Sequence, residues 1–135
     1  MTPADERVRV VAGIVIEAGR VLIARRTEAQ SFGLQWEFPG GKVEAGETDG
    51  EALAREFREE LGIEVEAEDL YDRIRYRDVR GRDLEVVFLR ARRIAGEPRN
   101  LEVDAVAWVA KDELGKVDFI PANRRIVERL SGEPG

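Results

Sequence analysis

The segment from Thr48 to Leu61 constrains the fold more than any other, because it carries the strongest helix signal in the chain. At roughly 100° per residue its apolar side chains fall in one stripe, which must be buried against another layer. This stripe consists of Leu53, Ala54, Phe57 and Leu61. Gly62 follows directly and is typical of the residue that ends a helix. The chain therefore needs a second layer on which this helix can pack.

Apolar and alternating runs predict that this second layer is a β-sheet. The predicted strands are 7–16, 21–24, 70–77, 84–94 and 102–110, with a short, broken one at 36–42. We predict a loop at 25–35, one helical turn at 111–115 and a helix at 121–130. Because the strands are mixed with helices far apart in sequence, we expect an α+β fold with a mixed sheet sandwiched between α-helices.

The size and composition predict one domain over 1–135, with 1–6 as a loose N-terminal tail. The chain has 135 residues, of which 43% are apolar, and it shows no repeat or linker. No apolar run approaches the roughly 20 residues of a membrane span, and the N-terminus lacks the pattern of a secretory signal. We therefore predict a cytoplasmic protein without a membrane partner, either a monomer or a homodimer.

Charge and missing residue types limit the chemistry. The net charge of −6 argues against binding a nucleic-acid polymer, so a small molecule is the expected partner. The chain has no histidine and no cysteine, which excludes a Ser–His or Cys–His nucleophile and any imidazole or thiolate metal site. A metal would have to sit among oxygen ligands, which favours Mg²⁺, Mn²⁺ or Ca²⁺.

Three carboxylates lie along one edge of the predicted helix, beside the buried stripe. Glu56, Glu59 and Glu60 are spaced i, i+3 and i+4, where like charges repel by roughly 0.2–0.5 kcal/mol per pair. A bound divalent cation would explain this acidic edge. A solvated helix face is the alternative, supported by the opposite charges at Glu51–Arg55 and Arg55–Glu59. Both interpretations stay open on the helix alone.

The preceding loop strengthens the functional interpretation. Gly40-Gly41 permits a close backbone approach to a metal or a phosphate. Glu47 stands eight residues before Arg55, so it could pair with that side chain and orient it.

Read together, residues 41–63 resemble the Nudix box, G-x5-E-x7-R-E-U-x-E-E-x-G-U, where U is a bulky aliphatic residue. Every fixed position is present at the right spacing, and the one departure is Phe57, where Leu, Ile or Val is usual. Residues 34–44 resemble the segment that leads into the box in the MutT branch, and 119–123 resemble the tail of that branch.

The resemblance implies a Nudix fold and Mg²⁺-dependent hydrolysis, with Mn²⁺ as a substitute. MutT-like enzymes convert a nucleoside triphosphate to the monophosphate and pyrophosphate, and they include enzymes that remove oxidised nucleotides such as 8-oxo-dGTP. By position, Glu56 would deprotonate the water, with Glu102 as second candidate, while Glu47 would orient Arg55 and Arg55 would hold Glu56. The implied metal ligands are the Gly40 carbonyl, Glu56, Glu59, Glu60 and Glu102, although Glu102 alone could be a solvated carboxylate.

The resemblance also implies a set of substrate-binding residues: Arg26, Phe38, Gly41, Lys42 and Asn123. The Asn123 amide can both donate to and accept from a guanine-like edge, but an Asn in a first helical turn also bonds nearby backbone. Arg26 could equally be a surface charge and Phe38 a core residue.

An aromatic residue contacts the base near Asp78 in MutT, but here the aromatic is Tyr76, two positions earlier. This leaves the oxidised-guanine preference open. Positive charge also gathers in the same predicted hairpin, where it could contact phosphate or simply be solvated: Arg73, Arg75, Arg77, Arg80 and Arg82.

The sequence leaves other functions open. Within the family, the substrate could be CTP or methyl-dCTP, a dinucleoside polyphosphate or a nucleotide sugar. A non-catalytic nucleotide-binding module is the alternative from another class, although it need not keep a water-activating glutamate. A structural domain with a solubilising acidic helix is the remaining option.

Overall fold

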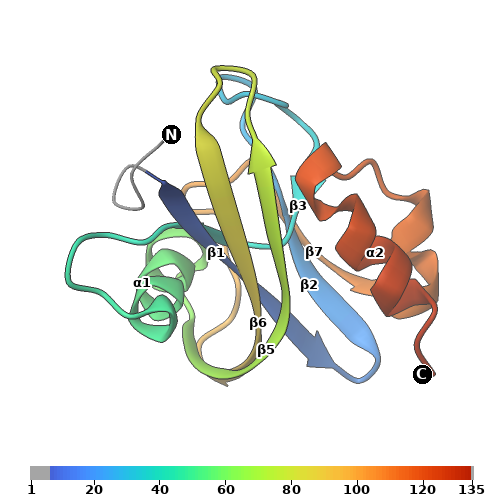
Figure 1. Ribbon diagram of the computed structural model, residues 1–135. Coiled ribbons are helices and arrows are strands. Elements are labelled where there is room, and N and C mark those ends of the chain that lie inside the picture. Colours follow the sequence, from blue (N-terminus) through green and yellow to red (C-terminus); the bar gives the residue numbers. More distant parts are fainter. Residues whose placement is uncertain (1–6, 135) are drawn as a thin grey trace.

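A mixed β-sheet forms the centre of the protein (Figure 1). The computed structural model describes residues 7–134, so the predicted tail at 1–6 lies outside the described residues. The elements are β1 (Val8–Glu17), β2 (Arg20–Arg25), β3 (Trp36–Glu37), β4 (Gly40–Lys42), α1 (Asp49–Leu61), β5 (Glu64–Arg77), β6 (Asp83–Ala95), β7 (Ala105–Ala110), the 3₁₀ helices η2 (Lys111–Lys116) and η3 (Pro121–Asn123), and α2 (Arg124–Ser131). Within 7–134, no helix has the length and hydropathy to cross a bilayer.

Strand β1 organises the sheet because it has neighbours on both sides. It pairs in parallel with β6, and antiparallel with β4 at its first half and with β2 at its end. The strand order is β3-β2-β1-β6-β5, with β4 beside β1 and β7 beside β2. The pairing of Ala12 with Gly40 and of Val11 with Gly41 places the glycine pair next to the middle of β1.

The two helices cover opposite faces of the sheet, as Figure 1 shows. One core cluster joins α1 to the sheet through Leu53, Phe57, Leu61, Val11 and Val87. The other lies on the α2 side and includes Ile14, Phe38, Phe88, Ile126 and Leu130. The prediction of a mixed sheet between helices is therefore confirmed.

Capping residues fix both ends of helix α1. The Thr48 hydroxyl accepts from the Glu51 N–H at 3.1 Å, and the Thr48 N–H donates to the Glu51 carboxylate at 2.9 Å, which is a capping box. Gly62 ends the helix with φ +69°, a conformation that favours glycine. The buried stripe includes Ala52 in place of the predicted Ala54.

Two predicted strand boundaries are wrong. Strand β5 starts at Glu64 rather than at residue 70, and its first part pairs with the end of β6 through irregular register. Its acidic side chains hid the alternation of buried and exposed positions. The predicted strand at 102–110 starts only at Ala105. The N–H groups of Leu101 and Glu102 instead donate to the Glu60 carbonyl, which ties this segment to the end of α1.

The unusual Phe57 has room because residue 13 is glycine. Phe57 is fully buried against the sheet. A Cβ atom at Gly13 on β1 would lie 2.7 Å from the Cε1 and Cζ atoms of the Phe57 ring. The ring thus occupies the space that any side chain at position 13 would need, and the two positions should be energetically coupled.

We predict that Gly13→Ala lowers the free energy of unfolding by about 1–3 kcal/mol through overpacking. In a Phe57→Leu background the same change should cost much less, giving a coupling energy of about 0.5–3 kcal/mol in a double-mutant cycle. Urea unfolding of the four proteins measures this. Strictly additive effects would show that the ring does not depend on the glycine.

Candidate active site

Arg55 joins the predicted catalytic residues of α1 to the preceding loop. Its Nε and Nη2 atoms donate to the two carboxylate oxygens of Glu47 at 2.7 and 3.0 Å. Its Nη1 donates to Glu56 at 2.9 Å and to Glu59 at 3.3 Å, and its Nη2 also donates to the Lys42 carbonyl at 2.9 Å. One guanidinium thereby fixes two acidic side chains of the helix and the backbone of β4.

The Glu56 carboxylate lies directly against the glycine pair. A Cβ atom at Gly41 would come within 2.5–2.6 Å of all three carboxylate atoms of Glu56, so only glycine admits the acid here. Burial raises the pKa of Glu56; the Arg55 guanidinium opposes this rise, and the charges of Glu59 and Glu102 add to it. A half-buried carboxylate held by one arginine can accept a proton nearer to neutral pH than a solvated one.

Glu60 is the most deeply buried acid of the edge, with 8% of its surface exposed. Its Oε1 atom is buried and, among residues 7–134, has no hydrogen-bond partner. Burial raises the pKa of Glu60 to about 9; Glu37, Glu56 and Glu102 add to the rise, and the Gly40 amide opposes it. A buried oxygen without a partner is costly in a folded protein, so it marks a position suited to a ligand.

Glu37 belongs to this acidic group, although its sequence position predicted no role for it. Its side chain on β3 is largely buried, and the Arg26 Nη1 donates to it at 2.8 Å. Burial raises the pKa of Glu37, Arg26 opposes the rise, and the charge of Glu56 adds to it. The sequence signal that could have identified Glu37 is an acidic residue between two large aromatic residues, Trp36 and Phe38.

Glu102 lies at the same end of α1, in the bend before β7. Its backbone N–H donates to the Glu60 carbonyl at 3.2 Å, and its charge raises the pKa of Glu56 and of Glu60. The side chain of Glu102 is exposed. The fold thus brings this acid, far along the chain, to the acidic edge.

The chemistry of these residues fits a hard divalent cation. All candidate ligands are oxygens, neighbouring carboxylates add to the raised pKa of Glu56 and of Glu60, and among residues 7–134 the buried Oε1 of Glu60 has no hydrogen-bond partner. The described part of the chain, however, gathers no three acidic side chains at the spacing of a ready-made metal cluster. Glu56 and the half-exposed Glu59 are instead paired with Arg55, at 2.9 and 3.3 Å.

The predicted substrate-binding residues occupy different environments. Asn123 is buried, and its Oδ1 accepts from the Phe38 N–H at 3.0 Å, a partner far along the chain rather than nearby helix backbone. Phe38 is only 2% exposed and packs on Phe88 and Phe119, so its ring lies in the core. Lys42 has an exposed side chain.

The fold and this acidic, arginine-braced helix define a Nudix hydrolase of the MutT type. The model of the NUDIX domain matches residues 6–130, and the chain belongs to that family.

Sequence and structure comparisons find similar proteins with related names. The chain is 43% identical over 128 residues to the "Putative 8-oxo-dGTP diphosphatase 2" of Mycobacterium tuberculosis, covering 90% of this chain and 86% of that protein. It is 37% identical to the "8-oxo-dGTP diphosphatase" of Haemophilus influenzae, covering 93% of each, and 34% identical to the "CTP pyrophosphohydrolase" of Escherichia coli, covering 90% and 89%. The solved structure of the E. coli ORF135 protein is similar with a TM-score of 0.83 at 32% identity, covering 94% and 91%.

The Arg55–Glu47 pair predicts a specific pH dependence of stability. The hydrogen bond from Arg55 lowers the pKa of Glu47 below its ordinary value of 4.5. Because the pKa is lower in the folded state, the pair contributes stability that is fully present above the unfolded value and is lost as the pH falls through the folded one. We predict that Glu47→Gln flattens the fall in melting temperature between about pH 6 and pH 3.

Glu28→Gln is the control, because Glu28 is exposed and makes no ion pair within residues 7–134. Its melting temperatures should follow the wild-type curve. Parallel curves for wild type and Glu47→Gln would contradict the assignment.

Proposed function

We propose that the protein hydrolyses a nucleoside triphosphate to the nucleoside monophosphate and pyrophosphate in the presence of Mg²⁺, or of Mn²⁺ as a substitute. One observation carries the proposal: Arg55 fixes the Glu56 carboxylate against Gly41, while the Glu60 carboxylate next to the Gly40 amide keeps a buried oxygen that no residue in 7–134 hydrogen-bonds. The protein would act in the cytoplasm on a small nucleotide, as a monomer or a homodimer.

The chain's own residues would divide the work. Glu56 would take the proton from the attacking water, with Glu102 as the second candidate for this role, and Arg55 and Glu47 would hold Glu56 in position. The metal would be held by the Gly40 carbonyl and by Glu56, Glu59, Glu60 and Glu102. The cation would neutralise phosphate charge and lower the pKa of water. Phosphoryl transfer depends mainly on such positioning and charge neutralisation.

We propose a guanine-type base, oxidised as in 8-oxo-dGTP, for the preferred substrate. Relatives in Haemophilus influenzae and Escherichia coli that match over 93% of this chain carry the name 8-oxo-dGTP diphosphatase. The Asn123 Oδ1 already accepts from the Phe38 N–H, but its NH₂ group donates no hydrogen bond within residues 7–134 and suits an acceptor on the base edge. Tyr76 supplies a partly exposed aromatic surface, and the charges of Asp78 and Arg26 act on its hydroxyl. Tyr76 lies two positions before Asp78, which departs from MutT, and we propose it as the counterpart of the base-contacting aromatic of that enzyme.

CTP is the second candidate, supported by the similarity to the E. coli CTP pyrophosphohydrolase. The core position of the Phe38 ring favours neither base. A screen of common, oxidised and methylated nucleoside triphosphates separates the two.

In that screen, with Mg²⁺ and product identification, we predict monophosphate and pyrophosphate as products, the highest kcat/KM for 8-oxo-dGTP, and no turnover with EDTA. Highest turnover of CTP or methyl-dCTP would reassign the substrate within the family. Nucleotide binding without any product would establish a non-catalytic module. If calorimetry detects no binding of Mg²⁺ or Mn²⁺, the acidic edge serves only to keep the helix surface solvated.

We predict that Glu56→Gln lowers kcat by about two to four powers of ten, the scale of lost general-base catalysis. The fold should persist, because glutamine still accepts from Arg55. Glu68→Gln is the control, since Glu68 is an exposed acid of β5 outside the site, and it should keep wild-type kcat. Near-normal turnover by Glu56→Gln, with Glu102→Gln inactive, would transfer the role to Glu102.

A further inference from the structure

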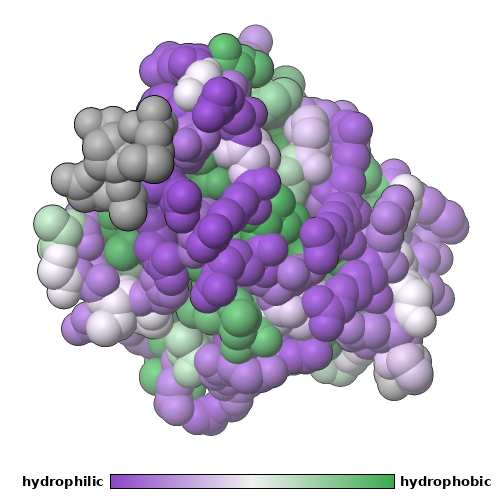
Figure 2. All heavy atoms as spheres, viewed as in Figure 1, coloured by the Kyte–Doolittle hydropathy of each residue, from purple (hydrophilic) through white to green (hydrophobic). Residues whose placement is uncertain are grey.

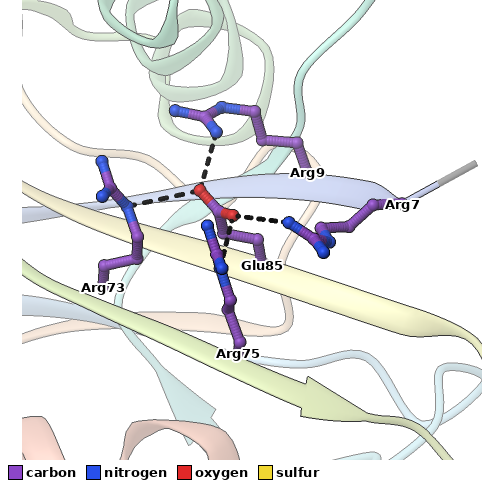
Figure 3. A pocket seen from close by; sticks show the side chains of 5 residues that line it. All are labelled: Arg7, Arg9, Arg73, Arg75 and Glu85. Atoms are coloured by element: carbon purple, nitrogen blue, oxygen red, sulfur yellow. Dashed lines mark hydrogen bonds and ion pairs between the residues drawn. The ribbon is translucent and has the colours of Figure 1, made fainter. Parts of the chain in front are cut away.

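A second charged cluster lies outside the acidic edge, around the buried carboxylate of Glu85 on β6. Glu85 is only 3% exposed. Arg7, which directly precedes β1, Arg9 of β1 and two arginines of β5 converge on it (Figure 3): Arg9 at 2.7 Å, Arg75 at 2.9 Å, Arg73 at 3.3 Å and Arg7 at 3.5 Å. From the sequence, the arginines between residues 73 and 82 could either contact phosphate or be solvated, and the structure places Arg73 and Arg75 in this cluster. We call these four residues the arginine cluster.

The four guanidiniums are not equally engaged. Those of Arg9 and Arg75 donate hydrogen bonds to the Glu85 carboxylate, and Arg9 also binds Asp49 through its Nε and Nη2 atoms. Arg73 and Arg7 contact the carboxylate only as ion pairs. Within residues 7–134 the guanidiniums of Arg73 and Arg7 donate no hydrogen bond, so their N–H groups remain available to another acceptor.

The cluster lines a hollow with a surplus of positive charge. Its volume is about 390 Å³, and its lining consists of the arginine cluster and Glu85, a size within the roughly 300–1,000 Å³ of small-molecule sites. Among residues 7–134, the four guanidiniums form ion pairs with only the two carboxylates of Glu85 and Asp49, an excess of two positive charges. Figure 2, which has the same view as Figure 1, shows that hydrophilic residues dominate the face formed by β5 and β6.

Guanidiniums held in place by a buried acid are arranged before a ligand arrives. Their planar forks match the oxygens of phosphate groups and bind them with two parallel hydrogen bonds. An unbalanced charge of two suits a multiply charged anion better than a single carboxylate. Every lining side chain is charged, so the hydrogen bonds that the hollow offers suit an anion, and a nucleobase would meet only arginine stems and guanidinium planes.

We propose that this hollow binds a polyphosphate anion, of which inorganic pyrophosphate is the simplest example. The site is separate from the acidic edge. Asp49, which holds Arg9, begins α1, and Glu56 follows seven residues later, about 10 Å along the helix axis. Binding here therefore needs neither the proposed hydrolysis nor a metal.

The test is calorimetric titration of pyrophosphate into the protein in EDTA, which removes any contribution from a metal at the acidic edge. We expect saturable binding that Arg73→Gln weakens about tenfold or more, the scale of one lost charge-assisted hydrogen bond. Arg92→Gln is the matched control. It removes the same charge from an exposed position of β6 that pairs with Glu66, and it should stay within about twofold of wild type, as expected for a rim charge.

Side-chain Nε resonances of the wild-type protein give a second readout that needs no variant. Pyrophosphate should shift the signals of Arg73, Arg75 and Arg9 and leave that of Arg92 unchanged. Parallel titrations with phosphate, a nucleoside triphosphate and the corresponding nucleoside identify the source. Tighter binding of the triphosphate than of pyrophosphate assigns the site to a nucleotide tail, whereas the nucleoside alone should not bind.

Absence of saturable binding would overturn the proposal, because the cluster would then only neutralise Glu85. Equal weakening of binding by Arg73→Gln and Arg92→Gln would also overturn it, because binding would then depend on net charge alone. Turnover by Arg73→Gln, measured separately with Mg²⁺, should equal that of wild type. Failure of this site thus leaves the proposed hydrolysis untouched, and the reverse also holds.

Discussion

The guanidinium of Arg55 makes the contact on which the acidic site depends. Three glutamates along one helix edge repel one another, and two of them accept from this side chain. The same group reaches Glu47 in the loop and the Lys42 carbonyl in β4, so it locks the helix to the sheet edge. Arginine suits this position because its rigid fork serves several acceptors at once, whereas a lysine ammonium is a single point charge on a flexible stem.

Close backbone approach is the second constraint, and it comes from the sheet. A Cβ atom at Gly40 would lie 1.9 Å from the Val11 carbonyl oxygen, and one at Gly41 would overlap the Glu56 carboxylate. The glycine pair therefore lets β4 pack between β1 and α1. Glu60 lies at this junction, where burial raises its pKa to about 9 and its Oε1 atom has no hydrogen-bond partner among residues 7–134. The electrostatic character of the site follows from how tightly these three elements meet.

Local patterns predicted most of what lies within one element, and they failed where distant segments meet. The helix, its ends and the Glu47–Arg55 spacing are readable because each depends on residues a few positions apart. Glu37 was missed because its importance arises only when β3 brings it beside α1. The start of β5 was missed because Glu64 and Glu66 face outward while β6 supplies the pairing. The gathering of Arg7 and Arg73 around one carboxylate likewise depends on β1 and β5 flanking β6.

The protein carries a net charge of −6, yet a nucleotide substrate and its products are anions. Net charge matters less than local charge, because salt screens exposed charges beyond about 8 Å at physiological ionic strength. The acidic edge would repel a phosphate unless a cation neutralised it, which is why the proposed hydrolysis includes a metal. The arginine cluster requires none, because Glu85 satisfies only part of its hydrogen-bonding capacity. The fold thus separates two proposed phosphate-binding sites along α1. The acidic edge would bind phosphate through a cation, and the arginine cluster near the first residue of the helix would bind it through guanidiniums.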